Sequence, residues 1–305
     1  MSRYTVCTSI ANVWRSPQSP RSCDQLSLTS SFDPRLWLEQ LDNHGLKGRL
    51  QLQGRLETQL LYGESVEVTS EQGQWLHICI PQQKISLQHP GYTGWVPREQ
   101  VCLSPSRDWN CPQVIITDTT CTLTLDGTRT RLPLSFMTSL PWVGELQDEV
   151  IVSTPSGKIG KLPLQAVTIV PSQSAMPPSI SRRLQLAQHF LGLPYLWGGT
   201  SAFGFDCSGF MYRVFAASGV QIPRDASVQA QFGQAILMSE IQAGDLLFFA
   251  HEQGNGSIHH VGMYIGDEQF IHAPKTGEHI QIASLASSPY LEELCQVRRY
   301  DGSEF

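Results

Sequence analysis

The sequence has few charged residues, and its acidic residues slightly outnumber its basic ones. Only 16% of its 305 residues are charged, and the net charge at neutral pH is −6. A protein whose main partner is nucleic acid or an anionic membrane surface needs a basic stripe that neutralises phosphate groups. The composition therefore argues against both of these partners.

Long apolar segments are missing as well. No run approaches the ~20 apolar residues that a membrane-spanning helix needs. The first residues, M-S-R-Y-T-V-C-T-S-I, show neither the apolar core nor the small-residue cleavage site of a signal peptide. Unless a leader precedes this sequence, we expect a cytoplasmic protein.

The eight cysteines lack the spacing of a metal site. They are scattered, with no C-x-x-C pair and no Cys/His ligand pattern, so we expect neither zinc nor another bound metal. The stretch G-K-I-G-K also lacks the spacing of a phosphate-binding loop, so we expect a hairpin turn there and no cofactor. A cytoplasmic location disfavours disulfides. For every cysteine except Cys207 we expect a small buried or surface residue.

The first part of the sequence is rich in strand patterns. Short runs such as 4–9, 65–68 and 75–79 alternate apolar and polar residues between Gly, Ser and Gln, which is typical of strands. One stretch differs, because Asp33 can cap a helix and Pro34 suits a first helical turn. We predict a small barrel over 1–106, with a helical insertion over about 33–50.

Two further domains are predicted after this barrel. Residues 107–171 are β-rich again, and a Pro- and Ser-rich loop, 171–179, then looks like a linker. From residue 180 an amphipathic helix ends at Gly192, and a second helix is predicted over about 207–218. Strand patterns follow at 245–249, 261–265, 270–272 and 295–300. Helices followed by a strand meander predict an α+β domain over 172–305.

Cys207 stands where a reactive thiol is expected. It lies between Asp206 and Ser208 in F-D-C-S-G-F, at the start of the predicted second helix. The positive end of the helix dipole and the free N–H groups favour a thiolate and can lower its pKa. The same N–H groups can hold an oxyanion during acyl transfer. From its position alone, Cys207 is either a nucleophile or one more structural thiol.

Two histidines on neighbouring predicted strands supply a base. His260 begins H-V-G-M-Y-I-G and His272 lies in F-I-H-A, with a short turn between the strands. Cross-strand residues lie about 5 Å apart, so His272 could orient the ring of His260 toward the thiol. His259 should point to the opposite face, and His251 lies in a polar loop. We expect both of these to be solvated.

At this point the motifs are similar to those of a known family. The motifs Y-L-W-G-G-T-S-A-F-G-F-D-C-S-G-F, I-P-R-D-A-S-V-Q, G-D-L-L-F-F, H-V-G-M-Y-I-G and F-I-H-A occur in this order over about residues 180–300. Together they resemble the NlpC family of bacterial cell-wall cysteine peptidases. The resemblance implies a papain-like α+β fold without a metal. It also implies that Cys207 is the nucleophile, His260 the general base and His272 the orienting residue.

The resemblance implies further site residues. It places Tyr195 at the oxyanion site, and it places Asp206, Ser208, Arg224 and Asp225 along the substrate-binding cleft. Other readings stay open for some of them. Arg224 and Asp225 could form a surface ion pair of little value, Ser208 could be an ordinary hydroxyl early in a helix, and Trp197 could be either cleft wall or core.

The first 171 residues resemble two bacterial SH3-like barrels. The stretches L-Y-G-E and G-Y-T-G-W-V-P carry the resemblance in the first barrel, and the second is more divergent. The resemblance implies that Glu64, Tyr92 and Asp206 surround the free amino group of an N-terminal L-Ala. Such a pocket would reject an acylated amine, because a buried charge without its partner is costly. Two structural alternatives stay open from sequence alone. Glu64 could be a solvated carboxylate, and Tyr92 could be an aromatic residue that packs in the barrel.

The resulting hypothesis is a cysteine peptidase that acts on murein tri- or tetrapeptides. It would hydrolyse the γ-D-glutamyl–diamino acid bond of peptides with a free N-terminal L-Ala, in peptidoglycan recycling. Two other classes stay open from sequence alone. One is a catalytically inactive cell-wall-binding or adhesion module, and the other is an amidase or acyltransferase on the same fold.

Overall fold

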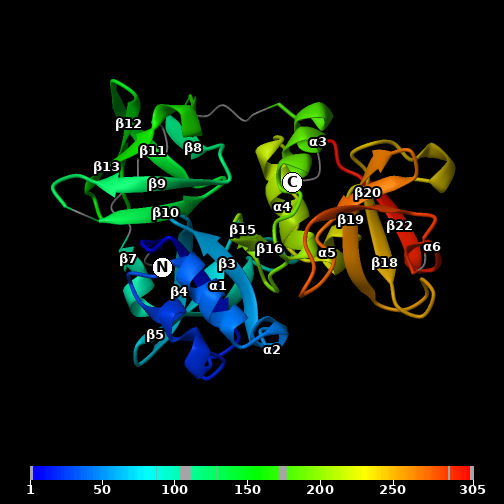
Figure 1. The fold of residues 1–305 in the computed structure, drawn as a ribbon, viewed down its shortest axis with the longest axis horizontal. Coiled ribbons are helices and arrows are strands. Elements are labelled where there is room, and N and C mark those ends of the chain that lie inside the picture. Colours follow the sequence, from blue (N-terminus) through cyan, green and yellow to red (C-terminus); the bar gives the residue numbers. More distant parts are fainter. Residues whose placement is uncertain are drawn as a thin grey trace. The chain divides into compact units, whose positions relative to one another are not determined.

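The chain forms two compact units (Figure 1). The computed structural model describes residues 3–86, 88–103, 111–128, 130–171, 177–287 and 289–302. The first unit consists of Met1–Gln82, Pro90–Ser174 and Ser201–Phe203, and the second of Gln83–His89, Ala175–Thr200 and Gly204–Phe305. Part of the predicted linker, 172–176, lies outside the described residues.

The first unit begins with a seven-stranded sheet in the order β3-β2-β6-β5-β4-β1-β7. Its strands are β1 (Arg3–Val6), β2 (Ile10–Trp14), β3 (Leu56–Leu61), β4 (Ser65–Gln72), β5 (Trp75–Ile80), β6 (Tyr92–Pro97) and β7 (Val101–Leu103), with a 3-10 turn, η2 (Arg98–Gln100), before β7. Side chains at alternate positions along the strands, such as Val13, Leu60 and Ile78, are fully buried in one hydrophobic core that the strands enclose. The period-2 pattern of the sequence thus builds the core of a small barrel.

Helices fill the long connection between β2 and β3. They are η1 (Ser22–Leu28), α1 (Pro34–Asn43) and α2 (Leu46–Leu50). As predicted, Asp33 caps α1, since its side chain accepts a hydrogen bond of 2.9 Å from the Arg35 N–H. Trp37 is fully buried and donates its indole N–H to Asp24. This connection therefore has its own packed interior.

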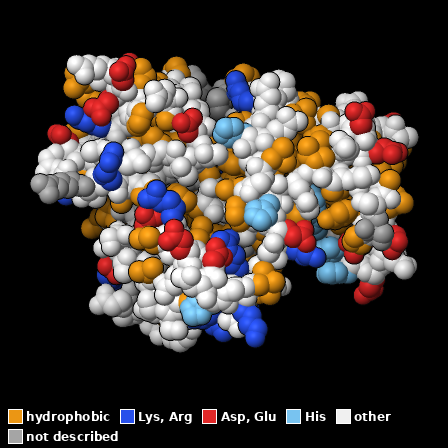
Figure 2. Space-filling model, in the orientation of Figure 1, with side chains coloured by type: hydrophobic (Ala, Val, Ile, Leu, Met, Phe, Trp, Pro, Cys, Tyr) orange, Lys and Arg blue, Asp and Glu red, His pale blue; other side chains and the backbone are white. Residues whose placement is uncertain are grey.

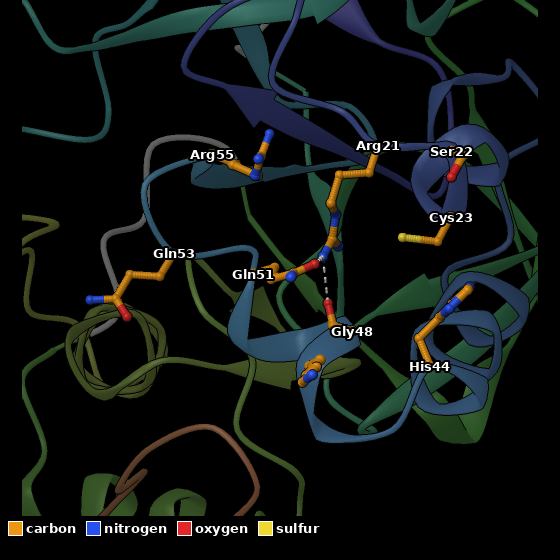
Figure 3. A pocket seen from close by; sticks show the side chains of 9 residues that line it. Arg21, Ser22, Cys23, His44, Gly48, Gln51, Gln53 and Arg55 are labelled. Carbon is orange, nitrogen blue, oxygen red and sulfur yellow. Dashed lines mark hydrogen bonds between the residues drawn. The ribbon is translucent and has the colours of Figure 1, made fainter.

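Arg21 ties the helices of this connection together. It forms an ion pair with the buried Asp24, and its Nη1 donates to the carbonyl of Gly48 at 2.9 Å. A side chain at Gly48 would lie 2.0 Å from the Leu41 carbonyl oxygen, so α1 and α2 can approach only with glycine there. Figure 3 shows the open polar pocket that results, lined by Arg21, Ser22, Cys23, His44, Lys47, Gly48, Gln51, Gln53 and Arg55.

A second seven-stranded sheet completes the first unit, in the order β10-β9-β13-β12-β11-β8-β14. Its strands are β8 (Gln113–Ile116), β9 (Thr120–Leu125), β10 (Arg131–Ser135), β11 (Ser139–Leu146), β12 (Glu149–Ser153), β13 (Ile159–Pro163) and β14 (Val167–Val170), with η3 (Leu164–Ala166) before β14. The G-K-I-G-K stretch lies at the β12–β13 hairpin, as predicted, with Gly157 at φ +77°. Tyr62, from the turn after β3, is buried in the core of this second barrel.

The second unit packs helices against a six-stranded sheet in the order β17-β22-β18-β19-β20-β21. Its helices are α3 (Ile180–His189), α4 (Cys207–Ala217), α5 (Ala226–Gln229), η4 (Met238–Glu240) and α6 (Tyr290–Glu293). Its strands are β16 (Gly204–Phe205), β17 (Gln234–Ala235), β18 (Leu246–Ala250), β19 (Ile258–Gly266), β20 (Gln269–His272), β21 (Gln281–Ser284) and β22 (Leu294–Arg299), while the short β15 (Thr200–Ser201) has one residue in each unit. The strand β19 pairs antiparallel with both β18 and β20, so these three strands form a meander.

The α+β pattern predicted for this part is confirmed. The four strands expected from the sequence correspond to β18, β19, β20 and β22, whereas β17 and β21 of the same sheet were not predicted. Figure 2 shows acidic and basic side chains interspersed on the visible face of the molecule. In the part of the chain that the structure describes, no helix combines the length and the apolar character needed to cross a membrane.

Candidate active site

Cys207 is the first residue of α4, and its surroundings fix it there. The Asp206 carboxylate caps the helix by accepting the Gly209 N–H at 2.7 Å. Any side chain at Gly209 would come within 2.1 Å of the Gly199 carbonyl oxygen, so glycine allows the preceding loop to press against α4. The N–H groups of Ser208 and of Val261 on β19 favour the charged form of the Cys207 sulfur. The thiol therefore lies between a helix N-terminus and the start of the central strands.

His260 and His272 lie together on β19 and β20, as the sequence predicts. His260 Nε2 and His272 Nδ1 are 2.8 Å apart, and both side chains are buried. Gly262 makes room for this pair, because a Cβ there would lie 2.6 Å from the Phe270 ring and 3.1 Å from the Cβ of His272. Since Nε2 of His260 faces His272, Nδ1 is the nitrogen that remains for the thiol.

His259 and His251 lie outside this pair. His259 is exposed on the other face of β19, as strand alternation requires, and its Nε2 lies 3.2 Å from a carboxylate oxygen of Glu293. The ring of His251 stacks on that of His259 with centroids 4.1 Å apart. The expectation that both are solvated is confirmed by their exposure.

The protonation of the site differs from the expectation for a helix N-terminus. Burial, followed by the charge of Asp206, raises the pKa of Cys207 to about 12, although N–H groups of Val261 and Ser208 act in the opposite direction. Burial, followed by the charge of His272, holds the pKa of His260 well below its usual value. The predicted lowering of the thiol pKa is therefore wrong, since desolvation outweighs the helix dipole. At neutral pH the Cys207 thiol and the His260 imidazole are therefore both neutral.

Asp206, Ser208 and Arg224 form one buried network. Arg224 is 1% exposed, and its Nη1 and Nη2 donate to the two carboxylate oxygens of Asp206 at 3.1 and 2.6 Å. The same Nη1 donates to the Ser208 hydroxyl at 2.9 Å. Arg224 is therefore not half of a surface pair. Besides this ion pair, the Asp206 side chain caps α4.

The structure places Tyr195 close to the thiol. Tyr195 is 6% exposed, and its backbone forms an isolated parallel β-bridge with Phe205, the residue before Asp206. Burial, with the charges of Cys207 and Asp206, raises the pKa of Tyr195 well above its ordinary value. Its phenol therefore keeps its proton and can donate a hydrogen bond. Trp197, two residues further along the chain, is half-buried, and Asp225 is the half-buried N-cap residue of α5.

Glu64 and Tyr92 belong to the first unit. Glu64 follows the turn after β3, where its Oε2 accepts the Leu61 N–H at 2.9 Å and its backbone carbonyl accepts the Val6 N–H at 3.0 Å. Tyr92 is the first residue of β6 and packs against the core of the first barrel. Both side chains are half-buried. The backbone contacts hold the Glu64 carboxylate in a defined position.

Sequence reasoning missed three residues that support this site. Gln229 is fully buried, and its Nε2 donates to the carbonyls of Ser208 and Pro223 at 3.1 and 2.8 Å. Tyr290 stands edge to face with His272 at a centroid distance of 5.2 Å. Of these three residues, Gly262 in H-V-G-M could have been found from the sequence, because a glycine inside a strand indicates that another segment approaches closely. The other two depend on contacts between distant segments.

Acid should destabilise the protein through His272. Burial lowers the pKa of this histidine from 6.5 to about 4, so between these values the unfolded chain binds a proton that the folded chain excludes. The stability that the neutral ring provides is complete above pH 6.5 and is lost as the pH falls toward 4. We expect the unfolding free energy to lose about 3 kcal/mol through this residue.

Urea unfolding of His272→Asn at several pH values checks this expectation. Asparagine keeps an acceptor for His260 but has no titrating group, so the variant should lose less stability between pH 6.5 and 4 than the unchanged protein. The exposed His189 provides the matched control, and His189→Asn should follow the unchanged protein. Parallel curves for all three proteins would contradict the buried, neutral state of His272.

The polar groups of the site are those of acyl transfer. Among the residues that the structure describes, no three His, Cys, Asp or Glu side chains gather in a way that could hold a metal ion. The groups that the site offers are a thiol, an imidazole pair, a phenol and helix N–H donors. Together they suit nucleophilic acyl transfer through a thioester.

Family models match three parts of the chain. The NlpC/P60 family matches residues 192–299, the YKFC SH3b2 domain matches 116–169, and the bacterial dipeptidyl-peptidase Sh3 domain matches 51–101. These matches confirm the fold class of two SH3-like barrels followed by a papain-like α+β domain. All of the proposed catalytic residues, Cys207, His260, His272 and Tyr195, fall within the first of these matches.

Relatives match nearly the whole chain. A γ-D-glutamyl-L-lysine dipeptidyl-peptidase of Bacillus subtilis is 40% identical over 97% of this chain and 98% of its own length. A protein of the same name from Bacillus cereus is 36% identical over 98% of this chain and 91% of its own. The crystal structure of an NlpC/P60 family protein from Bacillus cereus superposes with a TM-score of 0.93, at 36% identity, covering 98% of this chain and 99% of the other.

Proposed function

Because this chain belongs to the NlpC/P60 family of cysteine peptidases, we propose that it hydrolyses the γ-D-glutamyl–diamino acid bond of murein peptides that begin with a free L-Ala. The observation that carries the proposal is the joint position of Cys207, at the start of α4, and the His260–His272 pair, on β19 and β20. The names of the two Bacillus relatives, which match this chain almost from end to end, support the substrate class.

The proposed reaction proceeds through a thioester. Nδ1 of His260 takes the proton of the Cys207 thiol while the sulfur attacks the γ-carbonyl carbon of D-Glu. The Cys207 N–H and the Tyr195 hydroxyl donate hydrogen bonds to the oxyanion. The imidazolium then gives its proton to the leaving amine of the diamino acid, and the C–N bond breaks. Water, deprotonated by His260, releases L-Ala–D-Glu and restores the thiol.

The neutral resting pair suits this sequence of steps. A thiolate alone or an imidazolium alone is costly in this buried site, as their shifted pKa values show. Proton transfer between the two creates both charges together, so each becomes the partner of the other. His272 completes the arrangement, because a proton on Nε2 of His260 can be donated to Nδ1 of His272 at 2.8 Å. This leaves the reactive nitrogen, Nδ1, unprotonated before attack.

We propose that Glu64, Tyr92 and Asp206 bind the ammonium group of the substrate. Asp206 already has Arg224 as its counter-ion, so in this proposal Glu64 provides most of the negative charge. Ser208 and Arg224 hold the Asp206 carboxylate in place, and Asp225 and Trp197 contact the peptide. An acylated amine would carry no charge for this group of acceptors. The enzyme would therefore act on released peptides in peptidoglycan recycling, and not on wall whose L-Ala nitrogen is acylated.

Hydrolysis of L-Ala-γ-D-Glu-L-Lys, followed by mass spectrometry, tests this proposal. We expect L-Ala–D-Glu and L-Lys as products, and N-acetylation of the substrate should lower kcat/KM by about 10²-fold or more, since an interaction with a desolvated charge is lost. Glu64→Gln should remove most of that preference. Glu99, an exposed glutamate of the same barrel, provides the control, and Glu99→Gln should retain the preference.

Two results would contradict the proposal. Cleavage of polymeric peptidoglycan at the rate of the free tripeptide would show that a free amine is not required. An undiminished preference in Glu64→Gln would remove Glu64 from the ammonium site while leaving the peptidase reaction itself in place.

A further inference from the structure

Two cysteines of the first barrel lie where β1 and β7 pair, Cys7 directly after β1 and Cys102 within β7. β1 pairs with β7 so that Thr5 faces Cys102, and the Cys7 N–H donates to the Gln100 carbonyl at 2.9 Å. Cys7 is two residues beyond Thr5, so it lies diagonally across from Cys102 on the same face of the sheet. The two thiol groups interact with each other, both side chains are half-buried, and the Cys7 thiol donates to the Glu99 carbonyl at 3.9 Å.

The two sulfurs differ in acidity in a way that suits thiol oxidation. Its interaction with the Cys7 thiol lowers the pKa of Cys102 to about 7, against the effect of its burial. The same interaction raises the pKa of Cys7. Oxidants react with the thiolate, so Cys102 is the nucleophile and Cys7 is the neighbouring thiol that can resolve its oxidised form. In its protonated form the Cys102 thiol donates to the backbone carbonyls of Thr5 and Pro155, at 3.7 and 3.4 Å.

We propose that Cys7 and Cys102 form a reversible disulfide when hydrogen peroxide oxidises the protein. The Cys102 thiolate attacks one peroxide oxygen, which breaks the O–O bond and gives a sulfenic acid and hydroxide. The hydroxide takes the Cys7 proton and becomes water. The Cys7 sulfur then attacks the Cys102 sulfur, and the displaced hydroxide takes up a proton to give a second water. Two thiols have lost two electrons in total, and a dithiol reductant reverses the step.

The position of this pair gives the disulfide a structural consequence within the first unit. Val6, next to Cys7, accepts the Gly63 N–H and donates its own N–H to the Glu64 carbonyl, so β1 holds the turn that carries Glu64. Pro155, which contacts Cys102, lies in the hairpin between β12 and β13 of the second barrel. The disulfide would therefore join the end of β1, which holds the turn that carries Glu64, to β7, which contacts the β12–β13 hairpin.

Peptide mapping after mild oxidation tests the proposal. The full-length protein is treated with hydrogen peroxide, blocked with N-ethylmaleimide under denaturing conditions, digested without reduction and analysed by mass spectrometry. We expect a Cys7–Cys102 cross-linked peptide that dithiothreitol removes. Cys121, whose pKa burial raises to about 11, is the internal control and should carry N-ethylmaleimide. Alkylated Cys7 and Cys102 at a peroxide dose that oxidises other thiols would overturn the proposal.

A single substitution separates the two proposed roles. In Cys7→Ser no resolving thiol is present, so Cys102 should accumulate as a sulfenic acid that dimedone traps. In Cys102→Ser, Cys7 should stay reduced at the same dose. Equal dimedone labelling of the remaining cysteine in both variants would refute the assignment of Cys102 as the nucleophile.

Discussion

Cys207→Ala should abolish peptidase turnover and leave the fold intact. Loss of the nucleophile removes the thioester route, and the expected fall in kcat is at least about 10⁴-fold. The substitution removes one buried sulfur and no hydrogen-bond donor on which α4 depends, since the cap comes from Asp206. The rate of hydrolysis of L-Ala-γ-D-Glu-L-Lys and the thermal unfolding midpoint are the two quantities to measure.

A second buried thiol gives the matched control for this experiment. Cys23 is 8% exposed and lies in η1 of the first unit, remote in sequence from the candidate site. Cys23→Ala should keep the rate of the unchanged protein within a factor of a few. If Cys207→Ala retained a substantial part of the rate while remaining folded, Cys207 would not be the nucleophile.

Arg224→Met should destabilise the protein strongly. The guanidinium is the counter-ion of Asp206, and the two side chains are 1% and 11% exposed. Methionine fills a similar volume but leaves a buried carboxylate without its partner, which typically costs about 3–5 kcal/mol. Urea unfolding at neutral pH measures this loss. The activity should fall as well, because Arg224 holds both Asp206 and Ser208 beside the thiol.

Two further variants help to interpret that result. One replaces a more exposed arginine, and the other adds a second substitution to Arg224→Met. Arg98, 40% exposed in its pair with Glu71, should lose less than about 1 kcal/mol as Arg98→Met. Adding Asp206→Asn to Arg224→Met removes the unpaired charge and keeps a residue that can cap α4, so the double variant should be more stable than Arg224→Met alone. Equal effects of Arg98→Met and Arg224→Met would contradict the buried ion pair.

Local patterns in the sequence predicted much of the fold. Asp33 and Pro34 predicted the start of α1, and the strand-like runs predicted β1, β4 and β5 in the first unit and β18, β19, β20 and β22 in the second. The nearness of His260 and His272 was also predictable, because a short turn between two strands leaves few ways to pair them. These features depend on neighbours in the sequence, where period, caps and turns are strong signals.

Features that depend on distant segments were not predictable from patterns. Arg224 and Asp206 are 18 residues apart, and nothing in their sequence contexts indicates that they form a buried pair. The raised pKa of Cys207 depends on how completely the surrounding segments exclude water, which a helix-start pattern does not reveal. The pairing of Cys7 with Cys102 requires the register of the first and last strands of a barrel.

The most direct test of the central claim is covalent labelling with a substrate-like chloromethyl ketone. In this probe the ketone carbon of an L-Ala-γ-D-Glu analogue replaces the scissile carbonyl, so the residue that attacks the substrate becomes alkylated. A general alkylating agent is less informative, because the more acidic thiol of Cys102 would compete for it. Peptide mapping should find one label per chain, on Cys207, and N-acetylation of the probe should slow the labelling greatly. Labelling of another cysteine, or equal labelling by the acetylated probe, would contradict the account.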